Sequence, residues 1–111
     1  MGCDIQRAAD LGRVTVVFDG HLSAAEGVAS AAAFREALQN TKLDVVWDVS
    51  RMTAFDGGAR SAWAEAIWPV RDNVKSLKIV GAKGLVRVGA TFLALLLRKP
   101  HEFVDSPSAQ G

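Results

Sequence analysis

Two aspartates, Asp48 and Asp56, are the residues whose type and spacing most suggest chemistry. Two carboxylates could act as an acid–base pair, or one of them could accept phosphate. An acid–base pair needs tuned pKa values within a pocket, which two aspartates near a strand end do not supply. A receiver-type domain, which accepts phosphate on an aspartate, would need an acidic pair after its first strand, a lysine ending its last strand and one more strand–helix unit, and none of these is evident. We therefore predict no enzyme and expect Asp56 to cap a helix and Asp48 to hydrogen-bond the turn.

Glycines near the third predicted helix suggest a phosphate cradle. The segment GAKG at residues 81–84 is followed by Gly89. Its spacing matches neither the dinucleotide-binding G-x-G-x-x-G pattern nor a P-loop. We expect the glycines of the segment to form turns and Gly89 to be a close-packing position within a helix. A helix start beside Lys83, with Arg87 one turn on, would hold an anion only weakly, and no cofactor is predicted.

The chain has few residues of the kind that bind metals through nitrogen or sulfur. His21 and His101 are eighty positions apart, and Cys3 is the single cysteine. A structural or catalytic metal site needs three or four converging ligands, so we predict surface histidines and no metal. One cysteine excludes an internal disulfide. Myristoylation favours Ser or Thr at residue six, which is Gln6 here, so Cys3 is expected to be a free thiol.

Length and composition favour one self-contained domain. The chain has 111 residues, 50% of them hydrophobic, and a formal net charge of +1. That balance argues against nucleic-acid binding, which usually needs a strongly basic surface. The first residues lack the basic and apolar segments of a signal peptide, so a cytoplasmic location is expected. We predict a single domain over residues 1–105 and a disordered tail over residues 106–111.

The most apolar run, from Val88 to Leu97, is ten residues long. A membrane-spanning helix needs about twenty, so no membrane span is expected. The run is either a helix buried on most sides or one whose outer face is covered by another subunit. In the helix before it, Trp63 and Trp68 are five positions apart and cannot share the centre of one helical face. We expect Trp63 in the core and Trp68 at an exposed flank.

Hydrophobic periodicity and turn residues predict strands and helices in alternation. Strands are expected at residues 4–9, 13–19, 43–49, 76–81 and 101–105, and helices over about 24–39, 59–70 and 85–98. Ser23 and Glu26 predict a capping box, and Asn40 a left-handed helix end. In the first helix a buried stripe is expected at Val28, Ala31, Phe34 and Leu38. The order of elements predicts an α/β domain with a largely parallel sheet of four to five strands.

Alternation within the strands predicts which side of the sheet the helices cover. A sheet covered on both faces would have continuous apolar strands. Here the side chains opposite the core face are mostly polar: Arg13, Thr15, Asp19, Asp44, Asp48 and Lys78. We therefore expect about three helices packed mainly on one face. The other face would keep a small apolar group formed by Val17, Val46 and Val80.

A short motif follows the central strand. Residues 48–59 have the sequence DVSRMTAFDGGA. Together with the order of elements, which covers nearly the whole chain, this segment resembles the STAS domain, the fold of bacterial anti-sigma-factor antagonists. The family pattern is a strand, Asp-hydrophobic-Ser, and then Asp-Ser-Ser-Gly opening a helix. The resemblance implies a non-enzymatic, bacterial regulatory protein that binds a kinase-like or anti-sigma partner.

The same resemblance implies a phosphorylation switch that this chain lacks. In antagonists the serine directly after the second Asp is phosphorylated, and Gly57 occupies that position here. Neither Gly57 nor Gly58 has a hydroxyl group, and Ser61, one helical turn further on, is at most a displaced substitute. The chain therefore resembles a divergent branch of the family, related to small lipid-carrier-like and stand-alone STAS proteins, more than a working antagonist.

Two functional hypotheses follow. In the first, the chain is a regulatory interaction module that docks a protein partner or itself, as a homo-oligomer. Its predicted partner-binding residues are Asp56, Gly57, Gly58, Arg60, Ser61 and Trp68. In the alternative, the chain carries a small apolar or lipid-like ligand in a cavity lined by Trp63, Phe92 and Leu96.

Overall fold

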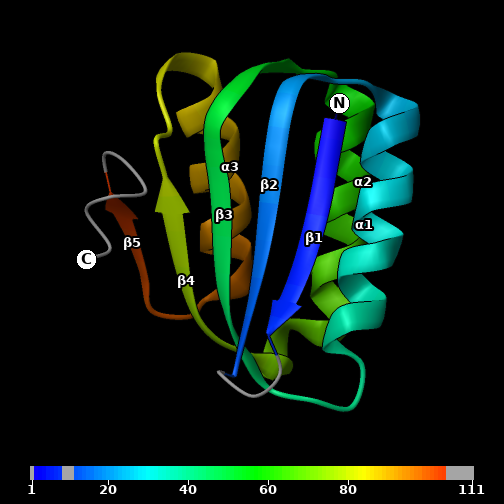
Figure 1. The fold of residues 1–111 in the computed structure, drawn as a ribbon, viewed down its shortest axis with the longest axis vertical. Helices are drawn as coiled ribbons and strands as arrows, with labels where there is room; N and C mark the ends of the chain where they lie inside the picture. The colour runs from blue at the N-terminus through cyan, green and yellow to red at the C-terminus, as the bar shows by residue number, and fades with distance from the viewer. Residues whose placement is uncertain (1, 9–11, 105–111) are drawn as a thin grey trace.

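A computed structural model of the protein describes residues 2–8 and 12–104, and Figure 1 shows its fold. The predicted tail at 106–111 and Asp105, the end of the last predicted strand, lie outside the described residues. The elements in chain order are β1 (Gly2–Ala8), β2 (Arg13–Leu22), α1 (Ala24–Leu38), β3 (Leu43–Phe55), α2 (Gly57–Val70), the 3-10 turn η2 (Arg71–Asn73), β4 (Val74–Val80), α3 (Gly84–Leu97) and β5 (His101–Val104).

The strands form one five-stranded sheet in the order β1-β2-β3-β4-β5. Strand β1 runs antiparallel to β2, and every other neighbouring pair is parallel. In Figure 1, α3 lies behind β3, and α1 and α2 lie side by side next to β1. Strand residues such as Val16 and Ile79 share one apolar core with helix residues such as Phe34 and Ile67. The predicted α/β class, the largely parallel sheet and the helices on one face are therefore confirmed.

The face of the sheet away from the helices has the predicted mixed character. Val46 and Val80 are buried, yet they do not belong to the main core. Val46 pairs with Thr15 on one side and Lys78 on the other, so polar residues flank an apolar one on this face. The alternation of apolar and polar residues along the strands was thus sufficient to distinguish the two faces of the sheet.

Two strands are longer than predicted. Strand β2 continues past Asp19 to Leu22, and β3 continues past Val49 to Phe55. Their ladder shifts register near Gly20, which has a φ of +73°. The polar residues end the apolar pattern, but backbone pairing between β2 and β3 does not need apolar side chains. This extension carries both strands beyond the rest of the sheet.

Helix α1 begins with the predicted capping box of Ser23 and Glu26, and Asn40 has the predicted positive φ of 65°. The predicted buried stripe is wrong at Val28, which is 59% exposed. Gly27 is buried instead, and a methyl group there would overlap Cα and Cβ of Ala59. In an alanine-rich helix the apolar pattern is nearly uniform, so close helix contact rather than hydrophobicity selects the inner face.

Helix α2 places its tryptophans as predicted. Trp63 is 2% exposed, whereas Trp68 is 50% exposed. The helix runs one residue past Pro69 and then tightens into η2. Trp63 belongs to the core, and Trp68 lies on the surface.

Helix α3 packs against the sheet along one side only. Gly89 is a close-packing position as predicted, because a Cβ there would come within 2.6 Å of Phe55 Cζ. The prediction of a helix buried on most sides is wrong, since its outer apolar residues are exposed: Leu85, Val88, Phe92 and Leu95. In the part of the chain that the structure describes, no helix is long and apolar enough to cross a membrane.

Candidate functional site

The start of α2 lies where the long strands β2 and β3 end side by side. The backbone N–H of Asp56 donates to Leu22 O at 2.9 Å, so the residues that follow the two strands are neighbours. Asp56 is the N-cap residue of α2 by position, but its side chain makes no capping hydrogen bond to that helix. Instead, its Oδ2 accepts a hydrogen bond from the N–H of Ala24 at 3.1 Å. The predicted cap therefore serves the first turn of α1 rather than that of α2.

Asp56 also contacts His21, with 2.7 Å between Oδ1 and Nε2. The hydrogen bond from His21 and that from the Ala24 N–H favour the ionised carboxylate and lower the pKa of Asp56. His21 is exposed, as predicted, but sequence reasoning missed this contact because the partners are 35 positions apart. The only available signal was that each residue lies close to the end of a parallel strand.

The two glycines after Asp56 have different surroundings. A Cβ at Gly57 would meet nothing within 4 Å, whereas a Cβ at Gly58 would come within 2.9 Å of Ala24 Cβ. At the other predicted carboxylate, Asp48 Oδ1 accepts hydrogen bonds from Ser50 N and Ser50 Oγ at 3.1 and 2.6 Å. Asp48 therefore holds the backbone after it, as predicted.

The predicted partner-binding residues divide between two surfaces. Gly58 and Ser61 line a groove of about 570 Å³ between α1 and α2. Arg60 points the other way, and its guanidinium lies 5.1 Å from the ring centroid of Phe92 in α3. Trp68 is not with them: it lies about 12 Å further along the helix than Arg60, in a hollow shared with Leu97. Gly58 and Ser61 thus face α1, Arg60 faces α3, and Trp68 lies in a separate hollow.

The outer face of α3 carries an apolar stripe. Leu85, Val88, Phe92 and Leu95 are separated by three, four and three positions, which places them along one side of a helix. Lys83 and Arg98 are the residues at the two ends of this helix, which itself contains no acidic residue. The Arg87 guanidinium lies 4.1 Å from the ring centroid of Phe103 in β5, and Lys99 Nζ lies 3.8 Å from Asp72 Oδ1. Periodicity showed that the helix was apolar, but it could not show which of its faces the small domain leaves uncovered.

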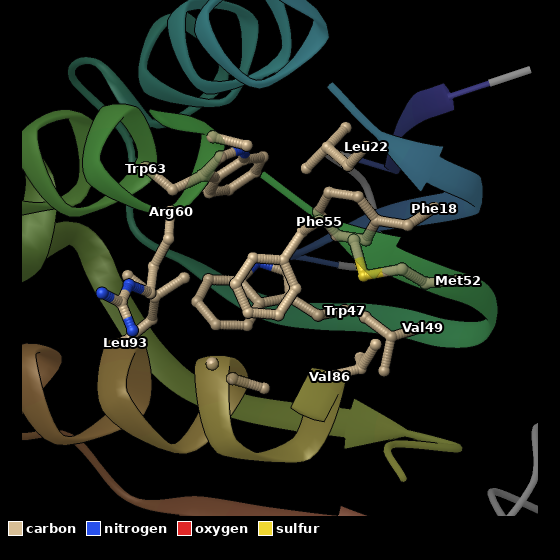
Figure 2. A pocket seen from close by; sticks show the side chains of 13 residues that line it. Phe18, Leu22, Trp47, Val49, Met52, Phe55, Arg60, Trp63, Val86 and Leu93 are labelled. Atoms are coloured by element: carbon tan, nitrogen blue, oxygen red, sulfur yellow. The ribbon is translucent and has the colours of Figure 1, made fainter. Parts of the chain in front are cut away.

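An apolar cavity lies between the sheet, the first turns of α2 and helix α3. Its volume is about 50 Å³, and Figure 2 shows the side chains around it. Trp63 is one of these side chains, as the carrier hypothesis predicted, but Phe92 and Leu96 are not. Phe92 faces outward and is 44% exposed. Sequence reasoning missed Trp47, which lines the cavity and whose Nε1 is buried with no partner among the described residues.

The remaining candidate groups are the thiol of Cys3 and the side chains that could bind a metal ion. Burial raises the pKa of the Cys3 thiol to about 11, so this cysteine is protonated and weakly nucleophilic at neutral pH. Among residues 2–8 and 12–104, no three histidine, cysteine or acidic side chains lie close enough to hold a metal ion.

Comparison with known proteins identifies the fold of this chain. No protein-family model and no curated protein matches the chain. Among solved structures, an uncharacterized protein of the DUF3478 family from Shewanella loihica, described as having a SpoIIAA-like fold, superimposes with a TM-score of 0.73 and 13% identity over 97% of this chain and 88% of that one. The anti-sigma factor antagonist SpoIIAA in its unphosphorylated form matches with a TM-score of 0.57 and 12% identity, over 98% of this chain and 93% of that one. The chain therefore has the SpoIIAA-like, or STAS, fold that its sequence predicted.

Proposed function

We propose that this protein is a non-catalytic regulatory module that binds a protein partner through the outer face of α3. The observation that carries the proposal is the apolar stripe on that face, where Leu85 is 80% exposed and Leu95 is 63% exposed. Adjoining exposed apolar side chains on a small domain typically mark an interaction surface. SpoIIAA, which shares the fold, is named an anti-sigma factor antagonist, and that name favours a regulatory binding role here.

The start of α2 would form the edge of the same surface. Arg60 extends over Phe92 and so joins the region at residues 56–61 to the stripe. Trp68 would extend the surface at the far end of α3, where it lies beside Leu97. Because Gly57 stands where antagonists have a serine, we propose that phosphorylation at this position does not control binding.

Charge favours a partner of a particular kind. Lys83 and Arg98 lie at the two ends of the helix that carries the stripe, so a partner with an apolar patch edged by Asp and Glu would be attracted and oriented. A second copy docking α3 against α3 would bring like charges together. The homo-oligomer predicted from the sequence would therefore form through another face.

A cross-linking experiment tests the proposal with a matched pair of positions. Val88 on α3 and Val28 on α1 are both 59% exposed. A photoreactive amino acid is placed at each position in turn, and the source cells are irradiated. We expect a discrete cross-linked protein from position 88 and none from position 28.

Three other results would contradict the proposal. A protein captured only from position 28 would move the binding surface to the groove between α1 and α2. Cross-links from position 88 to lipid alone would replace the protein partner by a membrane surface. Absence of any cross-link from position 88 would leave the stripe without a partner.

A further inference from the structure

Trp47, whose side chain lines the cavity behind α3, has one polar hydrogen that no described residue accepts. It belongs to Nε1 of Trp47, whose side chain is 2% exposed. The other buried tryptophan shows the usual arrangement, because Trp63 Nε1 donates to Ser30 Oγ at 3.0 Å. A buried indole N–H normally has an acceptor, since leaving it unpaired is unfavourable. Trp47 therefore has a buried, unpaired donor in the wall of this cavity.

The walls of the cavity suit an apolar molecule. Phe18, Val49 and Leu93 contribute to them from β2, β3 and α3, and Arg60 is the one charged residue among the side chains that line the cavity. The volume of about 50 Å³ exceeds the ~30 Å³ that a water molecule occupies in the liquid. A buried water normally makes two to four hydrogen bonds, and these walls offer few. An apolar molecule with one acceptor would match both the walls and the donor.

One wall of the cavity comes from a part of β3 that is paired on one side only. Met52 and Phe55 lie on the part of β3 beyond Asp48, where pairing with β4 has ended and only β2 is hydrogen-bonded. Figure 2 shows both side chains beside Trp47, facing those of α2 and α3. Phe55 packs closely on Gly89 of α3. A molecule larger than the cavity would therefore have to displace the side chain of Met52.

We infer that this cavity binds a small apolar molecule whose single, uncharged hydrogen-bond acceptor, such as a carbonyl oxygen, accepts the Nε1–H of Trp47. A charged acceptor at Trp47 is disfavoured because the side chains around the indole are apolar, and Arg60, the charged residue of the lining, is exposed with its guanidinium over Phe92. The cavity lies on the inner side of α3 and the apolar stripe on its outer side. The inference therefore goes beyond the proposed partner binding. Failure of one proposal would not affect the other, because the two sites lie on opposite sides of α3.

Nuclear magnetic resonance of the full chain with two matched probes tests this inference. Acetophenone and ethylbenzene have similar shapes, but only acetophenone has a carbonyl acceptor. The indole signals of the three tryptophans are followed as each probe is added. We expect acetophenone to move the Trp47 indole proton downfield, with little effect on Trp68, and to bind about fivefold more tightly than ethylbenzene. Equal affinities, or an unchanged Trp47 signal, would overturn the inference.

A variant separates the hydrogen bond from the cavity itself. Trp47→Phe keeps an aromatic ring and removes the N–H, so it should bind the two probes equally. Trp68→Phe, at an exposed position, should keep the preference for acetophenone. A preference that survives in Trp47→Phe would contradict the assigned donor. If Trp47→Phe does not fold, the comparison of the two probes on the unchanged protein still decides the question.

Discussion

The carboxylate of Asp56 lies 2.7 Å from the imidazole of His21 and also accepts a hydrogen bond from the first turn of α1. The side chain of Asp56 thus connects the ends of β2 and β3 with the starts of α1 and α2. The contact joins residues that are 35 positions apart in the sequence. It fixes the backbone position from which Gly57 and Gly58 begin α2.

This contact predicts a pH dependence of stability. Its hydrogen bonds lower the pKa of Asp56 in the folded protein below its value in the unfolded chain. Its contribution to stability is therefore present above the unfolded pKa of about 3.9 and is lost as the pH falls through the folded pKa. Asp56→Asn should be less stable than the unchanged protein at pH 6, and the difference should shrink by pH 3. Urea unfolding at both pH values measures the difference in the free energy of unfolding between the two proteins. A difference that does not change with pH would contradict the stabilising role of the ionised Asp56.

The two glycines at the start of α2 should respond differently to serine. Gly57→Ser has open space and should change the free energy of unfolding by less than about 0.5 kcal/mol. Gly58→Ser would crowd Ala24 and should destabilise the protein by about 1 to 3 kcal/mol. Chemical denaturation compares the two variants. Gly57→Ser also restores a phosphoacceptor, and failure of any antagonist-type kinase to label it would count against that relationship.

The two tryptophans of α2 should differ sharply when truncated. Trp63→Ala removes a core side chain and its hydrogen bond to Ser30, so it should lower the free energy of unfolding by about 3 to 5 kcal/mol. Trp68→Ala is the exposed control and should lower it by less than about 1 kcal/mol. A loss below about 1 kcal/mol for Trp63→Ala would refute its place in the core.

Close packing of α1 against α2 predicts an effect opposite to helix propensity. Alanine favours an isolated helix over glycine by about 1 kcal/mol. Gly27→Ala should nevertheless destabilise the protein by about 1 to 3 kcal/mol, because the added methyl group overlaps Ala59. The neighbouring Val28→Ala, at an exposed position, should have little effect. Thermal unfolding of both variants tests the contact, which would be disproved by a more stable Gly27→Ala protein.

Local sequence signals were sufficient for the elements and for the two faces of the sheet. The alternation along Arg13–Asp19, the capping box at Ser23 and the helical spacing around Trp63 each depend on residues near one another in the chain. The same signals could not place Val28 on the surface, because the neighbouring alanines made the face of α1 ambiguous. They also ended β2 and β3 too early, since backbone pairing continues where apolar side chains stop.

The candidate site was only partly predictable because its contacts are distant in sequence. Residues 56–61 were identified from a motif, but the contact of Asp56 with His21 required the strand ends to be placed side by side. The unpaired indole of Trp47 depends on what surrounds it in space. The exposed face of α3 depends on how much of its apolar surface the sheet can cover.

The central claim is that the outer face of α3 binds the protein partner. Once the cross-linked partner is identified and purified, its affinity for the protein is measured by calorimetry with two charge substitutions at equally exposed valines. Val88→Glu should weaken binding at least about tenfold, as substitution at an interface hot spot does, and Val28→Glu should leave the affinity unchanged. Equal affinities for Val88→Glu and the unchanged protein, or a loss confined to Val28→Glu, would contradict the claim.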